Sequence, residues 1–444
     1  RDGSSQISPA NRFQNFWAVG AAWDISKEEF MGSQHIFDFL KLKGSIGVLG
    51  NQSAYNSNDG TPLSYPFYPT LNTGSNAVFG TNVYTAADEK YFPDPNLKWE
   101  TVHAQEVGIE LNAFQNRLHF EANYFNKTTE DLMTYIDNSA LGLKDRLTNA
   151  GSLKNWGEEF SASWNQNISK DFTIDIGGNI TFLQNKVLSL SPDLANGQIL
   201  RGSQNNNSAV SLTRPGMPIG FFYGYVVEGL YQSYADILNS PNASSLGAYR
   251  PGDFKFKDIS GPDGKGPDGK ITSDDRTMIG NPSPKFIYGG SVTLNYKGIS
   301  LGIDVGGVYG NSIFRTWGSL ESPFQRVNYS AEKLNRWHGP GTSNWVPILS
   351  QADRFNYNGS SYNMEDGSYI RIRNVQLAYS FNKGMLSRLS IKDLRIFLNF
   401  QNPITWKHNL GYTPEYGGDA TQFGYDNGGG AIPAVSTVGL NLTF

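Results

Sequence analysis

The carboxyl-terminal stretch TVGLNLTF (437–444) alternates strictly between apolar residues and polar or small ones. Val438, Leu440, Leu442 and Phe444 share one parity, and the residues between them are Thr, Gly and Asn. Successive side chains of a β-strand point to opposite faces, so this period of two predicts a strand with one apolar face. The rest of the chain must show which medium that face contacts.

The same alternation recurs along the whole chain. Its clearest example is Phe172–Phe182, where Phe and Ile share one parity and Thr, Asp and Asn occupy most of the other. About eleven segments follow this pattern: Trp17–Trp23, Leu40–Gly50, Leu97–Ala113, Leu118–Lys127, Glu158–Asn165, Phe172–Phe182, Phe286–Tyr296, Ile299–Tyr309, Tyr369–Phe381, Leu394–Asn402 and Thr437–Phe444. Strands of roughly 9 to 11 residues suit a tilted crossing of a membrane.

The connections between these segments alternate between short and long. Short turns occupy 114–117, 167–171 and 297–298, whereas long stretches rich in Asn, Gly, Ser and Pro lie near 51–96, 129–150, 183–285, 310–366 and 403–435. Short turns on one rim and long loops on the other are typical of an outer-membrane barrel, as are aromatic residues at strand ends. The pattern favours an all-β, antiparallel transmembrane barrel, with a soluble β-sandwich as the alternative.

One helical signal interrupts the strands. The stretch SKEEF (26–30) places Ser26 at a cap position and Glu29 three residues later, which is the pattern of a capping box. It predicts a short helical turn between the first two strands, on the rim with short turns.

Composition supports a β-rich protein outside the nucleic-acid-binding classes. Hydrophobic residues make up 38% and charged residues 17% of the 444 residues, and Gly, Tyr, Phe and Trp number 49, 23, 27 and 9. The net charge of −4 gives no basic footprint for nucleic acid. The chain has no Cys, which excludes disulfides and thiolate sites, and no apolar run long enough for a membrane helix. Without an initiator Met or a signal peptide, it has the form of a mature or partial chain.

No catalytic constellation is present, so we do not expect an enzyme. The five His residues stand singly, and the chain has no nucleophile elbow. A formal Gly-x-Gly-x-x-Gly at Gly264, Gly266 and Gly269 contains Pro267 and has no predicted strand before it or helix after it, which argues against dinucleotide binding.

An Asp-rich loop offers a metal-site hypothesis. Asp258, Asp263, Asp268 and Asp274 lie in KDISGPDGKGPDGKITSDD, and carboxylate oxygens are the ligands that Ca²⁺ prefers. The spacing excludes a regular EF-hand, because its first and third ligand positions would fall on Gly. A divalent cation such as Ca²⁺ is one hypothesis, and a solvated acidic turn is the other.

Aromatic residues on the long loops are candidates for solute contact. Their rings could stack on sugar faces or pack against peptide side chains, or they could order their own loops or meet a lid protein. The candidates are Tyr55, Tyr65, Phe67 and Tyr68 in one loop, Phe221, Phe222 and Tyr223 in another, and Trp317, Trp337 and Trp345 in a third. Polar strand residues predicted to line a hydrated interior are Glu121, Asp175, Asn179 and Asp304.

Blocks along nearly the whole chain resemble the SusC-like (RagA/SusC) TonB-dependent transporters of Bacteroidota outer membranes. The matching blocks occur in family order. They are RDGSS (1–5), AVGAAWDISKEEFM (18–31), LKLKGSIGVLGNQ (40–52), DPNLKWETVHAQEVGIE (94–110), NRLHFEANYFNKTTEDLM (116–133), PGDFKFKDI (251–259), IGNPSPKFIYGGSVTLNYKGISL (279–301), DGSYIRIRNVQLAYSF (366–381), RIFLNFQNPITW (395–406), GYTPE (411–415) and the terminal strand.

The resemblance implies nutrient import by one large barrel. Such a barrel has about 22 strands, is plugged by an N-terminal domain and is energised by the TonB complex. Residues 1–444 would be the carboxyl-terminal part of that barrel domain, with the plug outside this chain. Another segment or chain would complete the barrel, because unpaired strand edges in lipid are costly.

The resemblance further implies partner proteins and a signal for barrel assembly. A SusD-like lipoprotein would cover the extracellular mouth, the solute would be an oligomeric glycan or peptide, and SusC–SusD pairs could dimerise. The apolar residues of the terminal strand would face outer-membrane lipid. They would also form the signal that the barrel-assembly machinery reads, and they are Val438, Leu440, Leu442 and Phe444. The alternatives are a channel or scaffold without its own solute, and a secreted lectin-like sandwich.

Overall fold

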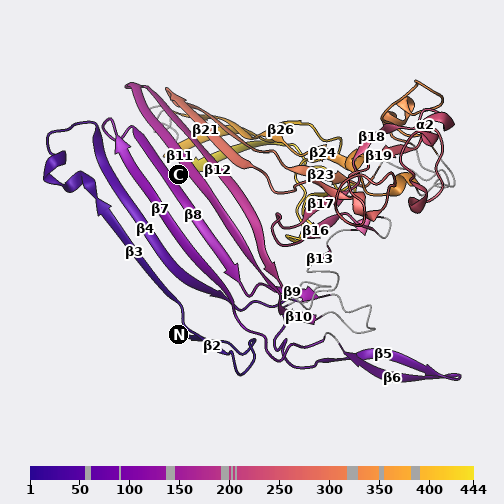
Figure 1. Ribbon diagram of the computed structural model, residues 1–444. Coiled ribbons are helices and arrows are strands. Elements are labelled where there is room, and N and C mark those ends of the chain that lie inside the picture. The colour runs from indigo at the N-terminus through magenta and orange to yellow at the C-terminus, as the bar shows by residue number, and fades with distance from the viewer. Residues whose placement is uncertain are drawn as a thin grey trace. The chain divides into compact units, whose positions relative to one another are not determined.

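A computed structural model describes residues 1–55, 62–89, 92–136, 146–191, 200–201, 204–205, 208–317, 329–349, 355–381 and 391–444. Its largest element is a sheet of eleven strands in the order β28-β26-β25-β22-β21-β12-β11-β8-β7-β4-β3 (Figure 1). These strands are β3 Trp17–Asp24, β4 Phe37–Asn51, β7 Glu100–Ala113, β8 Leu118–Glu130, β11 Gly151–Ser169, β12 Phe172–Leu190, β21 Phe286–Tyr296, β22 Ile299–Tyr309, β25 Tyr369–Ser380, β26 Asp393–Lys407 and β28 Val435–Thr443. Each predicted segment overlaps one of them, which confirms the all-β prediction.

The chain folds into two compact units. The first contains 1–160, 184–200 and 214–217, and the second contains 161–183, 201–213 and 218–444. Among the described residues, the eleven-stranded sheet ends at β3 on one side and at β28 on the other. That another segment or chain completes the barrel stays a prediction.

In the second unit, the pairing register aligns apolar residues into rows that cross six strands. One row is Phe172, Tyr296, Ile299, Tyr379, Ile396 and Leu440, and the next is Ile174, Leu294, Leu301, Leu377, Leu398 and Val438. Many of these side chains are exposed, and Val438 reaches 76%. A continuous exposed apolar band across a sheet is the surface that a lipid bilayer covers.

The opposite face of the same strands is polar. Its rows include Asp175, Thr293, Gly302, Gln376, Asn399 and Thr437. On this face Gly439 pairs with Phe397, whose ring occupies the space that a Cβ at position 439 would need. The small residue in the terminal strand therefore makes room for an aromatic ring of its neighbour.

A β-bulge in β25 keeps the two faces separate. Against β22 the register skips Arg373, which is therefore the extra residue on that side, whereas against β26 it skips Arg373 together with Asn402 and Pro403. Apolar residues occupy even positions before the bulge, as in Ile370, and odd positions after it, as in Val375. An inserted residue reverses the parity that follows it, so the apolar band continues without a break.

The first unit repeats the pattern over β3, β4, β7 and β8. Cross-strand partners on its apolar face include Trp23, Leu42, Ile109 and Ala122. On its other face, Lys41 Nζ lies 3.4 Å from Glu110 Oε2, and Lys43 pairs with Glu121. Charged residues therefore face one another across strands instead of facing the apolar band.

The capping-box prediction for Ser26 is wrong. The connection between β3 and β4 contains two 3₁₀ turns, η1 Ile25–Lys27 and η2 Glu29–Met31, so Ser26 lies inside the first turn. The Ser26 hydroxyl donates to the Asp24 carboxylate, whereas neither N-cap makes a side-chain hydrogen bond. The Ser26 hydroxyl therefore donates to a nearby carboxylate instead of accepting from a backbone N–H, as a capping residue would.

The long connections contain small sheets that alternation does not reveal. They hold the pairs β1 Asp2–Gly3 with β2 Phe13–Gln14, β5 Leu71–Phe79 with β6 Asn82–Glu89, β9 Met133–Ile136 with β10 Arg146–Asn149, β14 Gln204–Asn205 with β15 Ser208–Ala209, and β18 Val227–Leu230 with β19 Phe254–Phe256. They also hold the sheet of β13 Leu200–Arg201, β16 Ser211–Thr213, β17 Phe221–Gly224 and β20 Thr277–Gly280, and the sheet of β23 Ser312–Arg315, β24 Met364–Asp366 and β27 Tyr425–Asp426.

Among the described residues, helices are few and short. They are α2 Tyr234–Leu238 and the 3₁₀ turns η4 Ser244–Leu246, η5 Ser273–Asp275, η6 Ala331–Asn335, η7 Phe355–Tyr357 and η8 Ser361–Asn363, besides η1 and η2. Within the described part of the chain, no helix combines the length and the apolar character that a membrane crossing requires.

We expect a charge on the apolar band to be far more damaging than the same charge on the polar face. Leu377→Arg should destabilise the intact protein in lipid vesicles by about 2–4 kcal/mol, the usual cost of Arg near the middle of a barrel's lipid face. Gln376→Arg, on the neighbouring residue, is the control and should cost much less. Urea unfolding in vesicles measures both, and equal costs would contradict the assignment of the faces.

Candidate functional site

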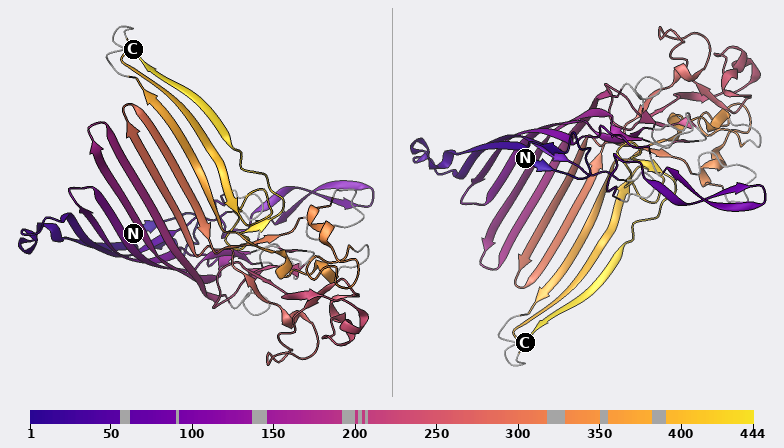
Figure 2. Two further views of the ribbon diagram at one scale, coloured as in Figure 1. Left: turned by 90° about the horizontal axis from the view of Figure 1, so that it is seen from above. Right: turned by 90° about the horizontal axis from the view of Figure 1, so that it is seen from below.

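In the second unit, the long connections fold together into one structured body. This loop assembly, residues 218–285, 311–317, 329–349, 355–368 and 408–428, lies at one end of the unit's long strands (Figure 2). Its core is a cluster of buried residues, Tyr225, Val227, Leu230, Ala243, Phe254, Phe256, Ile271, Phe355 and Tyr362. The cluster includes close aromatic pairs, such as Phe256 and Phe355 with ring centroids 5.3 Å apart. The loops therefore have a hydrophobic core of their own.

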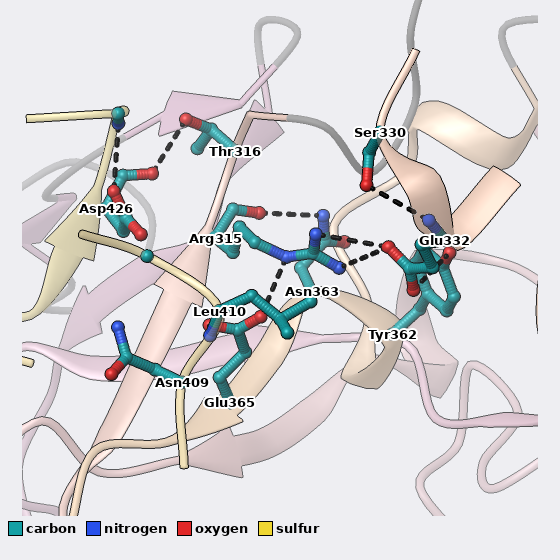
Figure 3. A network of polar contacts seen from close by, with 12 residues as sticks. Arg315, Thr316, Ser330, Glu332, Tyr362, Asn363, Glu365, Asn409, Leu410 and Asp426 are labelled. Atoms are coloured by element: carbon teal, nitrogen blue, oxygen red, sulfur yellow. Dashed lines mark hydrogen bonds and ion pairs between the residues drawn. The ribbon is translucent and has the colours of Figure 1, made fainter. Parts of the chain in front are cut away.

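A buried arginine joins three parts of the loop assembly (Figure 3). Arg315, at the end of β23, is 3% exposed; its two terminal nitrogens lie 3.2 Å from Glu332 Oε2, and its Nε lies 2.9 Å from Glu365 Oε1. The hydroxyl of Tyr362 donates to Glu332, and the backbone N–H of Leu410 donates to Glu365. Burial raises the pKa of Glu365, although the charge of Arg315 opposes that shift.

The last loop is attached to β23 at a second point. The carbonyl oxygen of Asp426 accepts hydrogen bonds from the backbone N–H and the hydroxyl of Thr316, each at 3.0 Å. Next to it, the rings of Tyr425 and Phe314 stack with planes 2° apart and centroids 5.7 Å apart. The Asp426 side chain is fully buried and accepts the Gly428 N–H at 2.8 Å.

A third attachment fixes the last loop to strand β25. Glu415 accepts from Arg371 Nη1 at 2.5 Å and from Arg373 Nη2 at 2.9 Å, and the hydroxyl of Tyr369 also donates to it. Arg371 is 3% exposed, and its Nε donates to Thr405 on β26 at 2.8 Å. Burial alone would raise the pKa of Glu415, but these three donors outweigh it and hold the pKa below its usual value. The motif GYTPE therefore carries a clamp between loop and barrel wall.

Residues on both sides of position 412 are fixed as well. Lys407 Nζ donates to the carbonyl oxygens of Asn409 at 2.6 Å and Gly411 at 2.5 Å. Asn409 Nδ2 in turn donates to the carbonyl oxygen of Thr413 at 2.8 Å. Hydrogen bonds to a charged group are among the stronger ones in proteins, so the two from Lys407 stabilise the turn.

The predicted aromatic residues of the first unit divide into one core residue and three exposed ones. Phe67 is 5% exposed and packs with Leu63, Leu97 and Leu147, so it orders its own loop and is not available to a solute. Tyr55, Tyr65 and Tyr68 are each more than half exposed. Solute contact stays a prediction for these three.

The predicted aromatic residues of the second unit divide in the same way. Phe221 and Phe222 are fully buried, and Trp337 packs against the core cluster while its Nε1 donates to Gln232 Oε1 at 3.2 Å. These rings order the loop assembly. Trp345 is 47% exposed beside Tyr362, and Trp317 is half-buried beside Tyr412.

The Asp-rich loop uses its carboxylates to bind backbone N–H groups. Asp258 accepts from the N–H groups of residues 268 and 269, Asp263 from that of residue 265, and Asp268 from that of residue 270, while Asp274 is exposed. The neighbouring Asp275 is fully buried and accepts three N–H groups. Within the described ranges, no group of three or more His, Asp or Glu side chains is placed to hold a metal ion. The cation hypothesis stays a prediction without a gathered ligand set.

The predicted interior residues lie on the polar face. Glu121 pairs with Lys43, Asp175 accepts from the Asn165 amide, and Asp304 is exposed. Asn179 lies beside Gly289 of the paired strand. At the end of the chain, Val438, Leu440, Leu442 and Phe444 are all exposed on the apolar side, while their role as an assembly signal stays a prediction.

Sequence reasoning missed the charged clamps. None of the predicted site residues belongs to these clamps, which are formed by Arg315, Glu332, Glu365, Arg371 and Glu415. Two of the blocks that resemble the transporter family contain Arg371 and Glu415. The signal that could have found them is the rarity of charge in this chain, at 17%, combined with two arginines inside an apolar strand pattern. Buried charged residues require partners. The two arginines of the stretch RIR (371–373) therefore indicate that a carboxylate from elsewhere in the chain lies beside them.

Removing the charge of Glu415 should release the last loop. Glu415→Gln keeps the side-chain shape but leaves Arg371 buried without a carboxylate, and we expect a local loss of about 1.5–3 kcal/mol. Hydrogen exchange of segment 407–416 in the intact protein should become faster by the corresponding factor. Glu228→Gln, at an exposed glutamate of the same unit, is the control. Unchanged exchange in Glu415→Gln would contradict the clamp.

The loop assembly should gain stability at acid pH through Glu365. Its pKa in the folded protein lies above the ordinary 4.5, so the folded state binds the proton more tightly than the unfolded chain does. The stability of the wild type relative to Glu365→Gln should therefore rise as the pH falls from above the raised pKa toward 4.5. Hydrogen exchange at a series of pH values measures this difference, corrected for intrinsic exchange rates. A difference that falls toward acid pH would contradict the assignment.

Comparison with known proteins identifies the family. The family model described as TonB dependent receptor-like, beta-barrel matches residues 2–403. The chain is 30% identical over 462 residues to TonB-dependent receptor P3 of Formosa agariphila, covering all of this chain and 43% of that protein. It is 26% identical over 423 residues to TonB-dependent receptor SusC of Bacteroides thetaiotaomicron, covering 93% of this chain and 39% of that protein.

A solved structure shares the fold. The structure of the RagAB peptide transporter matches 99% of this chain with a TM-score of 0.79 and 20% sequence identity, over 44% of the matched chain. The chain therefore spans less than half the length of the relatives that it matches. These relatives bear the names of receptors and transporters and not of enzymes, and the chain belongs to the TonB-dependent receptor β-barrel family of bacterial outer membranes.

Proposed function

We propose that the intact protein carrying this chain imports an oligomeric nutrient, glycan or peptide, across the outer membrane. In this proposal it is the SusC-like partner of a SusD-like lipoprotein that covers the mouth, and the TonB complex supplies energy through a part of the protein outside residues 1–444. Solute is captured between lid and loops and then released inward. The residues described here bind and orient but break no covalent bond.

The observation that carries the proposal is the pairing of a two-faced sheet with a structured loop assembly. The second unit presents an apolar band on one face, a polar wall on the other, and loops fixed by Arg315 and Glu415. A polar wall suits a hydrated path, and rigid loops suit recognition, because a preorganised surface loses little entropy when it binds. The likeness to the RagAB peptide transporter supports an oligomeric solute.

A second function is an outer-membrane channel or scaffold in a larger assembly without its own solute. The buried ion pairs of the loop assembly are equally compatible with a permanent protein partner. The import proposal also includes the predicted dimer, in which two pairs of transporter and lipoprotein associate.

Purification of the native complex in mild detergent distinguishes the two functions. Import predicts a lid lipoprotein in the complex, together with an oligosaccharide or peptide released on denaturation and seen by mass spectrometry. It also predicts that uptake stops when the TonB complex is disabled. A constant large partner without any released solute, and without a requirement for TonB, would contradict import and favour the scaffold.

A further inference from the structure

The connection between β3 and β4 is longer than the reversal of two antiparallel strands requires. It occupies residues 25–36, whereas residues 297–298 alone join β21 to β22. Two residues are enough to close such a hairpin. Figure 1 shows the longer connection as a coiled segment beyond the ends of β3 and β4. Its additional residues are therefore not needed for strand pairing.

This connection folds back onto the apolar face of the sheet. Trp23 lies in the cross-strand row that continues through Leu42 and Ile109, so its ring is on the face that lipid covers. The indole Nε1 of Trp23 donates to Glu28 Oε1 at 2.8 Å. The Phe30 ring lies edge to face with the Trp23 ring, with centroids 6.5 Å apart. Residues 28 and 30 are thus held on the lipid side of β3.

Hydrogen bonds also fix the other end of the connection. Gln34 Oε1 accepts the backbone N–H groups of Ile36 and Phe37, each at 2.8 Å, and Gln34 Nε2 donates to the Phe37 carbonyl oxygen at 2.9 Å. The backbone N–H of Phe114, in the turn between β7 and β8, donates to the Ile36 carbonyl oxygen at 2.9 Å. The connection is therefore attached to the sheet at both of its ends.

The large apolar side chains of this rim nevertheless remain exposed. Phe30 is 65% exposed, Ile36 53%, and both Trp23 and Phe114 48%. Because Trp23 belongs to the apolar band, these side chains extend the lipid-facing surface beyond the ends of the strands. A Trp ring with its N–H bonded to a polar group is typical of the boundary between lipid and water.

The charges of this segment are unbalanced. Lys27 is the only Lys or Arg in residues 24–36, and its Nζ lies 2.9 Å from Asp24 Oδ2. That pair leaves the exposed carboxylates of Glu28 and Glu29 without a basic residue in the segment. Carboxylates beside aromatic rings attract ammonium groups, and they repel a surface of anionic lipids.

We infer that residues 25–36 form a membrane-interface anchor that lies among phospholipids whose head groups carry a primary ammonium group. Phe30 and Trp23 lie at the boundary between head groups and acyl chains, and Glu28 and Glu29 face the ammonium groups. This position removes apolar rings from water while it keeps the carboxylates at the level of the head groups. The anchor is independent of the solute, so it goes beyond the proposed import function.

Fluorescence quenching by spin-labelled lipids tests where the anchor lies. Phe30→Cys is introduced into the intact protein without other cysteines, labelled with bimane, and reconstituted in vesicles of phosphatidylethanolamine and phosphatidylcholine. The control is Phe79→Cys, since Phe79 is 69% exposed in the same unit and follows the opposite end of β4. We expect lipids labelled near the head group to quench position 30 at least about twofold more than position 79.

Competition between two lipids tests the head-group chemistry. The intact protein is equilibrated with equal amounts of phosphatidylethanolamine and phosphatidylglycerol, and the lipids retained after detergent washing are counted by native mass spectrometry. The wild type should retain more phosphatidylethanolamine. Glu28→Gln should lower that ratio by about fivefold, the effect of one charge at a membrane surface, although its amide oxygen can still accept the Trp23 N–H. Glu89→Gln, at an exposed glutamate of β6, is the control.

Equal quenching at positions 30 and 79 would overturn the anchor. A preference of the wild type for phosphatidylglycerol would overturn the assignment of the head group, and so would equal ratios in Glu28→Gln and Glu89→Gln.

Discussion

Pairing of backbone hydrogen bonds in a medium without water is the constraint on which the rest of this structure depends. Lipid offers no partner for an N–H or C=O group, so each strand must bond to a neighbour and each side chain on one face must be apolar. The register of β12, β21, β22, β25, β26 and β28 satisfies both demands at once, because it aligns Ile and Leu residues into unbroken rows. The bulge at Arg373 shows how strict the demand is. An inserted residue is tolerated only because the sequence changes parity with it.

The loop assembly obeys a different rule. It lies outside the membrane-spanning strands and has its own aromatic core, and its charged residues act between segments that are distant in sequence. Arg315 joins Glu332 to Glu365, and Glu415 joins the last loop to Arg371. Buried ion pairs contribute little net stability, since desolvation offsets their attraction, but removing one partner is costly. Their effect is to select one arrangement of the loops.

The two rules differ in how readily they can be read from a sequence. Alternation is local, so Phe286–Tyr296 and Ile299–Tyr309 were predicted to the residue. The clamp of Glu415 to Arg371 joins positions 44 residues apart, and no pattern within a segment reports it. Ser26 matched a capping box, but the hydroxyl bound Asp24, which lies two residues before it. Phe67 and Phe222 resembled the exposed loop aromatics in composition and context, and only packing distinguishes a core ring from a surface ring.

Accessibility of single cysteines on adjacent residues tests the two-faced sheet most directly, because this chain contains no Cys of its own. Ile303 lies on the apolar face of β22, and Asp304 lies on the polar face. In the intact protein in outer-membrane vesicles, Asp304→Cys should react with a water-soluble maleimide. Ile303→Cys should not, and a fluorophore attached there before reconstitution should be quenched by lipid-linked quenchers. The reverse result, with Ile303→Cys labelled from water and Asp304→Cys facing lipid, would contradict the account.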